Sequence, residues 1–229
     1  EGYELQSNYL RTLQELATTT QNKGLDLELT IQSYATASHY HTVSANRLAL
    51  QTHLALAFGT KTLGYFRYTG TGDTEPEANS TITQTIDADD ALKNAVLYAN
   101  KNGNYLKAHM TFFDYTKSKV FGSGSYVSTS GLIQEALTKD IITVPNEATV
   151  LVNEFYNEHT SQYGYYVVNL AQLHYTSLGY DVTNDDITIT LSKDCLVYKD
   201  YNSYETEETS RVKSVTLSDG QGAFIVVED

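Results

Sequence analysis

The chain has 229 residues, of which 41% are hydrophobic, and it carries a formal net charge of −13 with a single cysteine. This length allows one large domain or two small ones, whereas the negative charge, with no cluster of lysine or arginine to offset it, excludes nucleic acid as an expected partner. No apolar run approaches the roughly 18 residues that a membrane-spanning helix needs, and one cysteine excludes an internal disulfide and a cysteine-based metal site.

The first elements alternate between helix and strand. Apolar residues at helical spacing predict a helix over residues 3–22, with Leu16 on its apolar stripe and Gly24 at its carboxyl-terminal cap. Residues 25–34 then alternate strictly between apolar and polar side chains, which is the period of a strand. Residues 35–43 are polar and are predicted to form a loop.

A second helix and a second strand follow this loop. Ser44 suits the N-cap of a helix that ends at Gly59, and residues 62–68 form the next strand. The order strand, helix, strand is a βαβ unit, and it predicts that the two strands are parallel neighbours. Residues 69–87 form a long loop without periodicity, and a third helix is predicted over residues 89–106.

The remainder of the chain has a different character. Short apolar or alternating segments, separated by turn residues about every 8 to 15 positions, predict an antiparallel β-sandwich. Gly220 marks one such turn, residues 131–137 allow one or two helical turns, and Cys195 is expected to be a buried small apolar side chain. We therefore divide the chain into residues 1–106 and a β-sandwich domain over residues 107–229.

The motifs of the first part occur in an order known from one enzyme family. Residues 31–34 end a strand as Ile-Gln-Ser-Tyr, residues 47–59 read Arg-x-x-x-Gln-x-x-Leu-Ala-Leu-Ala-Phe-Gly, and residues 63–68 read Leu-Gly-Tyr-Phe-Arg-Tyr. Residues 91–100 and the strand-like run 164–170, with its Val-Asn, continue the set. This ordered set resembles the end of the TIM barrel, and the small β domain after it, in the family 42 beta-galactosidases and their relatives.

The resemblance implies a fold class, α/β plus all-β. Residues 25–34 become strand seven and residues 62–68 strand eight of a TIM (β/α)8 barrel, followed by an antiparallel β-sandwich. The first six strands are then missing, in agreement with a chain that begins at Glu1 without a methionine. Because strand seven would expose an unpaired edge, the expected partner is the missing amino-terminal barrel segment or another chain that covers this edge.

Candidate site residues lie where these two strands end, since TIM-barrel chemistry occupies the carboxyl ends of the strands. The resemblance implies a nucleophilic glutamate at the end of strand seven, but this sequence has glutamine there. A carboxylate about 13 Å earlier on the strand is either catalytic or a polar residue inside the barrel. His39 and His41, after strand seven, either contact sugar, bind a metal ion or are solvated. Tyr34 and Tyr68 lie either on the rim of the barrel or in the core, and Phe66 is expected in the core. Glu28 is the one candidate for a catalytic residue, and the catalytic residues are otherwise unknown. The candidates for substrate binding are Gln32, Tyr34, His39, His41 and Tyr68.

Two classes of function fit these observations. The first is the carboxyl-terminal part of a glycoside hydrolase acting on galactose-like or related glycans, inactive alone because the second catalytic carboxylate is absent. The alternative is a non-catalytic carbohydrate-binding or structural module, favoured by the missing glutamate and the 19 tyrosines. A complete α+β domain without barrel ancestry requires that the two strands not pair in parallel. Carbohydrate is the expected partner, no cofactor or metal is expected, and the composition favours an extracellular or cell-surface location without deciding the compartment.

Overall fold

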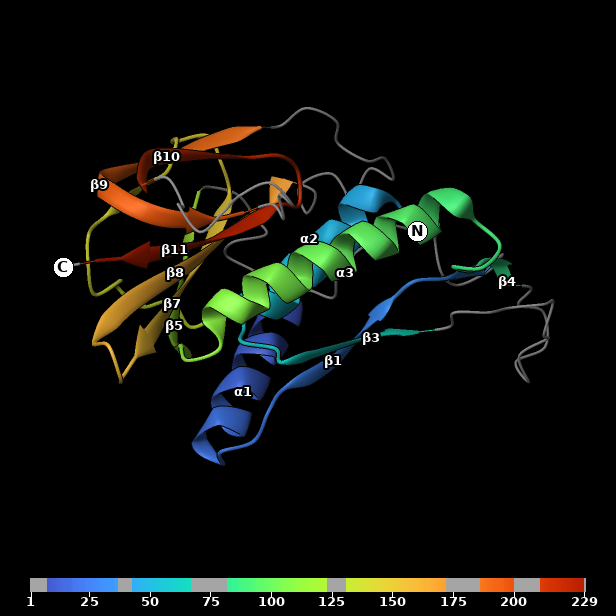
Figure 1. The fold of residues 1–229 in the computed structure, drawn as a ribbon, viewed down its shortest axis with the longest axis horizontal. Coiled ribbons are helices and arrows are strands. Elements are labelled where there is room, and N and C mark those ends of the chain that lie inside the picture. The colour runs from blue at the N-terminus through green and yellow to red at the C-terminus, as the bar shows by residue number, and fades with distance from the viewer. Residues whose placement is uncertain are drawn as a thin grey trace.

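The computed structural model describes residues 8–36, 43–66, 82–122, 131–171, 186–199 and 211–228. It combines helices with strands (Figure 1), so the predicted mixed α/β content is confirmed. None of the described helices is long and apolar enough to cross a bilayer. In chain order the elements are α1 (Tyr9–Asn22), β1 (Glu28–Gln32), β2 (Ala35–Thr36), α2 (Ala45–Ala57), β3 (Thr62–Phe66), β4 (Ile82–Gln84), α3 (Asp90–Met110), β5 (Asp114–Phe121), β6 (Ile142–Thr143), β7 (Val150–Asn157), β8 (Gln162–Asn169), β9 (Ile187–Tyr198), β10 (Arg211–Leu217) and β11 (Gly222–Val227).

Strands β1 and β3 form a two-stranded parallel sheet. Its register runs from the pair Glu28–Thr62 to the pair Gln32–Phe66, and α2 is the crossover between the strands. The prediction of parallel neighbours is therefore confirmed. The first strand begins later than predicted because Leu25 still belongs to the end of α1, where its N–H donates to a carbonyl of the last helical turn at 2.8 Å.

The ends of α2 follow from its sequence. Ser44 adopts an extended backbone, and its hydroxyl accepts a hydrogen bond from the N–H of Arg47 at 3.3 Å, which is the geometry of an N-cap. At the other end Gly59 has a φ of 77°, and the N–H of Thr60 donates to the carbonyl of Ala55 at 3.1 Å. Glycine adopts this left-handed conformation without a steric penalty. The predicted start and stop of this helix are both confirmed.

Helix α1 buries much of its predicted apolar side, since Leu13 is buried and Tyr9 packs on the same core, but Leu16 does not follow this prediction. Leu16 is 39% exposed, because the helix turns Gln14 toward the sheet instead. The Gln14 amide donates to Tyr115 Oη at 3.2 Å and to the carbonyl of Ile133 at 2.8 Å. A pattern that counts only apolar residues misses this polar anchor. The buried residues of α1 are Leu10, Leu13, Gln14 and Ala17.

The strands after α3 join one seven-stranded antiparallel sheet with the order β10-β9-β11-β8-β7-β5, and β6 pairs with β9. The long strand β9 connects two parts of this sheet, since it pairs with β6 at Leu191 and with β11 at Val197. The prediction of helical turns over residues 131–137 is wrong. This segment is irregular because it runs beside β5, where the N–H of Glu135 donates to the carbonyl of Ser118 at 2.9 Å.

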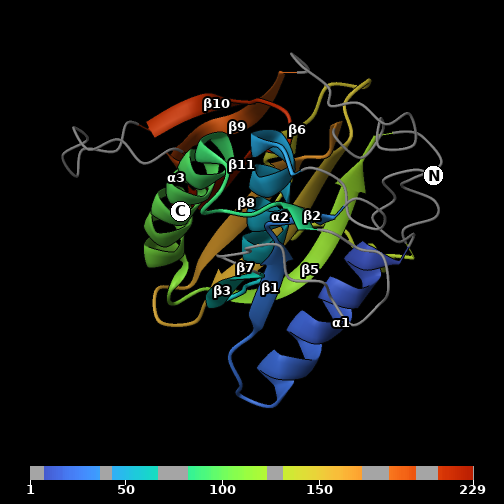
Figure 2. The same ribbon diagram turned by 90° about the vertical axis from the view of Figure 1, so that its right-hand side faces the viewer.

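Three apolar clusters hold these parts together. The first lies between the three helices and one face of the antiparallel sheet, and it includes Leu54, Leu106 and Phe155. The second lies within the sheet on its other face and contains Cys195, which is fully buried as predicted. The third joins α2 and α3 to the parallel pair and includes Ile31. Helices α2 and α3 therefore lie between the two sheets (Figure 1), and α1 packs beside β5 (Figure 2).

Candidate functional site

The predicted site lies at the carboxyl ends of β1 and β3. Gln32, the last residue of β1, is half-buried, and its side-chain amide donates to the carbonyl of Tyr34 at 2.9 Å. The next residue, Ser33, is buried, and its hydroxyl donates to the carbonyl of Phe66 at 2.5 Å. The bond from Ser33 to Phe66 joins the two strand ends. The last residue of β1 is therefore a glutamine and not a carboxylate.

The two aromatic side chains at this end differ in exposure, and only Phe66 departs from its predicted position. Tyr34 is only 9% exposed, whereas Phe66, which was expected in the core, is 49% exposed. Their ring centroids are 5.3 Å apart and the rings are tilted by 50°. The side chains of β3 alternate, and Phe66 falls on the face that no described element covers. An exposed aromatic ring braced by a buried one is a surface on which the apolar face of a sugar can stack.

Glu28 lies at the opposite end of β1 and is exposed. Glu28 lies four positions before Gln32, which corresponds to about 13 Å along a strand. The structure thus does not bring this carboxylate to the predicted site. His39, His41 and Tyr68, the other predicted binding residues, lie outside the described residues.

The outer edge of β1 is partly closed by a side chain. The carbonyl of Leu27 accepts the N–H of Lys61 at 2.8 Å, so it points toward β3. Because backbone groups of successive strand residues point to opposite sides, those of Glu28, Thr30 and Gln32 point away from β3. The backbone of Gln32 is bonded to the side-chain amide of Gln51, which accepts a hydrogen bond from the Gln32 N–H at 2.9 Å and donates one to the Gln32 carbonyl at 3.4 Å. In the described part of the chain, β1 and β3 pair only with each other.

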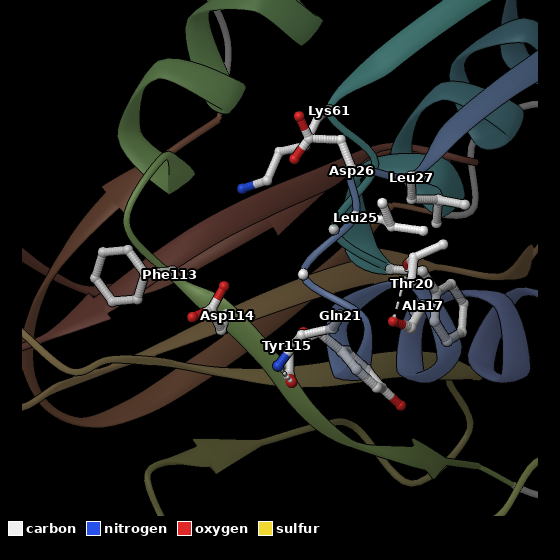
Figure 3. Close-up of a pocket in the computed structure, with 13 residues that line it drawn as sticks. Ala17, Thr20, Gln21, Leu25, Asp26, Leu27, Lys61, Phe113, Asp114 and Tyr115 are labelled. Carbon is white, nitrogen blue, oxygen red and sulfur yellow. Dashed lines mark hydrogen bonds between the residues drawn. The ribbon is translucent and has the colours of Figure 1, made fainter.

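A larger pocket, of about 250 Å³, lies at the amino-terminal ends of the same strands. Figure 3 shows Asp26 and Lys61 on one side of it and Asp114, Gln21 and Tyr115 on the other. Gln21 donates to the Tyr115 carbonyl at 2.9 Å. The ends of α1 and α2 also line the pocket, and helix carboxyl termini carry partial negative charge. The arrangement is suited to a small polar or cationic ligand, and it lies at the opposite end of β1 and β3 from the predicted site.

A second cavity lies between α2, α3 and the turn that joins β10 to β11. His53 and Tyr166 share a buried hydrogen bond of 2.8 Å beside it, and burial raises the pKa of the Tyr166 hydroxyl well above its ordinary value. The turn itself, predicted at Gly220, is confirmed by a φ of 71°. A Cβ atom at Gly220 would lie 2.7 Å from the carbonyl oxygen of Asn46 and 3.1 Å from Leu50 Cβ. The turn therefore packs directly on α2.

One buried carboxylate was not predicted. Glu154 on β7 is 1% exposed, and it accepts hydrogen bonds from the N–H and hydroxyl of Thr138 at 2.6 and 2.8 Å and from the Thr116 hydroxyl at 3.2 Å. Lys117 Nζ lies 3.7 Å away. These donors explain how a charge is tolerated in the interior. Glu154 therefore holds the end of the irregular segment, at Thr138, against the antiparallel sheet.

The described residues contain no group of three or more His, Cys, Asp or Glu side chains that could hold a metal ion. Comparisons with protein-family models, with curated proteins and with solved structures gave no match.

Proposed function

We propose that this chain is the carboxyl-terminal part of a glycoside hydrolase, in which β1 and β3 are the last two strands of a TIM barrel. One observation carries the proposal: β1, α2 and β3 form a parallel βαβ unit with helices on one face and none of the described elements on the other. Parallel sheets are normally covered on both faces. In the wall of a TIM barrel, helices cover the outer face of the strands and the inner face turns toward the barrel interior.

The residues on the open face support this assignment. Glu28, Thr30, Thr62 and Phe66 are all exposed, and they alternate with side chains that pack on α2 and α3. In a closed barrel this face would line the interior. The substrate would then lie at the Gln32–Phe66 end, with Phe66 as a stacking surface for a galactose-like or related sugar.

The strand edges indicate the partner that this proposal requires. The backbone N–H and C=O groups of Glu28 and Thr30 that point away from β3 are suited to pairing with a parallel strand that precedes β1. The backbone groups of β3 that point away from β1 are suited to pairing with a further strand on that side. The partner is the missing amino-terminal barrel segment or another chain that supplies equivalent strands. This chain alone is expected to be inactive, because hydrolysis needs two carboxylates about 5 to 10 Å apart.

The antiparallel sheet is assigned to the β-sandwich that follows the barrel. Residues of β6, β9 and β10 share one buried cluster with residues of β7, β8 and β11. Packing of one part of a curled sheet on another is the arrangement of a sandwich.

Hydrolysis of a panel of nitrophenyl glycosides by the intact polypeptide tests the proposal. We expect Gln32→Ala to lower kcat/KM by about tenfold or more, as loss of a substrate contact does. Glu158→Gln, an exposed change in the turn between β7 and β8, serves as the control and keeps wild-type activity. Absence of turnover on every glycoside, with the protein folded, would overturn the enzymatic proposal.

A non-catalytic carbohydrate-binding module is the second candidate, and the exposed Phe66 ring beside Tyr34 is the observation that favours it. Glycan-array binding without hydrolysis, lost in Phe66→Ala and retained in Phe112→Ala, would support this candidate. Phe112 is 66% exposed and provides a matched aromatic control outside the predicted site.

A further inference from the structure

A cavity of about 120 Å³ lies between the start of β3 and the middle of α3. It is formed by elements of the helical layer and the amino-terminal end of β3, so it is separate from the carboxyl ends of the strands, and it does not depend on the proposed function. Its polar lining consists of hydroxyl, ammonium and amide groups, and no carboxylate lines it. The polar residues that concern us are Thr60, Lys61, Asn100, Asn104 and Lys107.

The Thr60 hydroxyl is the most informative group in this cavity. Thr60 is 3% exposed, and its Oγ1 atom is buried without a hydrogen-bond partner among the described residues. The backbone N–H of Thr60 is used by the end of α2, so only the side chain is available. Buried hydroxyls are almost always hydrogen-bonded, because burial without a partner is unfavourable. The hydroxyl therefore indicates that a ligand atom belongs beside it.

Lys107 gives this cavity a positive charge in a protein whose net charge is −13, whereas the Lys61 ammonium bonds to the end of α3. Lys107 Nζ donates to the carbonyl of Lys61 at 3.2 Å, and Lys61 Nζ donates to the carbonyl of Thr111 at 3.4 Å. Neither lysine has a carboxylate partner within 4.0 Å in the described part of the chain. Since an ammonium group has three donors, Lys107 keeps two for a ligand.

We propose that this cavity binds a tetrahedral oxyanion, phosphate or sulfate, either free or as an ester group. Such an anion presents several acceptor oxygens, which match donors from the Thr60 hydroxyl, the Lys107 ammonium group and the asparagine amides. The absence of a lining carboxylate makes the same cavity unsuitable for a cation. Local lysine charge is needed here because the overall negative charge of the protein repels anions.

The test is a titration with inorganic phosphate and with inorganic sulfate, followed by calorimetry and by thermal unfolding, at an ionic strength held constant with KCl. We expect saturable binding, weakened about tenfold by Lys107→Gln and by a smaller factor in Thr60→Val. The control is Lys93→Gln, an exposed lysine of the same helix, which keeps wild-type affinity. Thr60→Val conserves shape and removes only the buried hydroxyl, so it stays informative if Lys107→Gln fails to fold.

Glucose 6-phosphate and neutral glucose distinguish the two sources of the anion. Binding of the ester together with inorganic phosphate assigns the site to a phosphorylated ligand, and binding of the inorganic ion alone assigns it to the free anion. A response to phosphate and sulfate that equals the response to KCl would overturn the proposal, and so would an equal loss of affinity in Lys93→Gln. In either case the Thr60 hydroxyl is satisfied by water alone.

Discussion

At the scale of single residues, buried tyrosines couple the stability of the protein to alkaline pH. Tyr165 is fully buried; burial, and next the negative charge of Glu154, raises the pKa of its hydroxyl above the ordinary value of 10.0. In the folded protein this hydroxyl keeps its proton after the unfolded chain has lost it. The stabilisation is therefore fully present below pH 10 and is lost as the pH rises above 10.

Tyr165→Phe tests this coupling. We expect the wild type to lose about 1 kcal/mol more of its unfolding free energy than the variant between pH 10 and pH 11. At pH 8 the variant itself is less stable by about 1 kcal/mol, because the N–H of Lys139 loses its acceptor at 3.2 Å. Urea unfolding at pH 8, 10 and 11 measures both effects. Tyr98→Phe, at a residue that is 53% exposed, is the control; parallel pH curves for wild type and Tyr165→Phe would contradict the expectation.

At the scale of elements, two glycines that line the same helical layer have opposite roles. Gly59 ends α2 with a φ of 77°, whereas Gly103 lies inside α3. A Cβ atom has ordinary van der Waals space at both positions, with nearest atoms at 3.7 Å. We expect Gly59→Ala to destabilise by about 1 to 2 kcal/mol through left-handed strain, and Gly103→Ala to stabilise by about 0.5 to 1 kcal/mol. Chemical denaturation of the two variants checks the signs, and an equal effect of both substitutions would refute the conformational explanation.

The same elements show what could be predicted from the sequence. Caps and periodicity are local, so the limits of α2 at Ser44 and Gly59 and the parallel pairing of its flanking strands could be predicted. The short pair β2–β4 and the irregular segment at residues 131–137 depend on distant partners, and neither was expected. Glu154 has its donors 16 and 38 residues away along the chain, so no sequence window contains its environment.

The candidate site was predictable to a similar extent. Alternation correctly placed Gln32 within a strand, although β1 ends at Gln32 and not at the predicted residue 34. The exposure of Phe66 depends on what covers the sheet. The cavity beside Thr60 is formed by residues of β3 and α3 that are about 40 positions apart in the chain. The burial of the Thr60 hydroxyl therefore could not be predicted from the sequence around it.

At the scale of the whole molecule, one core connects segments that the sequence divides near residue 106. Leu54 of α2 and Leu106 of α3 share a buried cluster with Phe155 and Phe224 of the antiparallel sheet. We therefore expect the described helices and the sheet to unfold in one cooperative transition. Far-ultraviolet circular dichroism and tyrosine fluorescence should give the same denaturation midpoint. Two separate midpoints would show that the sheet is stable without the helices.

The turn at Gly220 has a consequence for how this sequence changes over time. Surface hairpins usually drift in length between relatives, since they contact little else. This turn is pressed against the first half of α2, so that even a β-carbon at Gly220 would meet the Asn46 carbonyl at 2.7 Å. An inserted residue there would push the helix away from the sheet. We therefore expect relatives of this chain to keep both the length of the β10–β11 hairpin and the glycine in it. These two features are suited to guide the alignment of distant relatives.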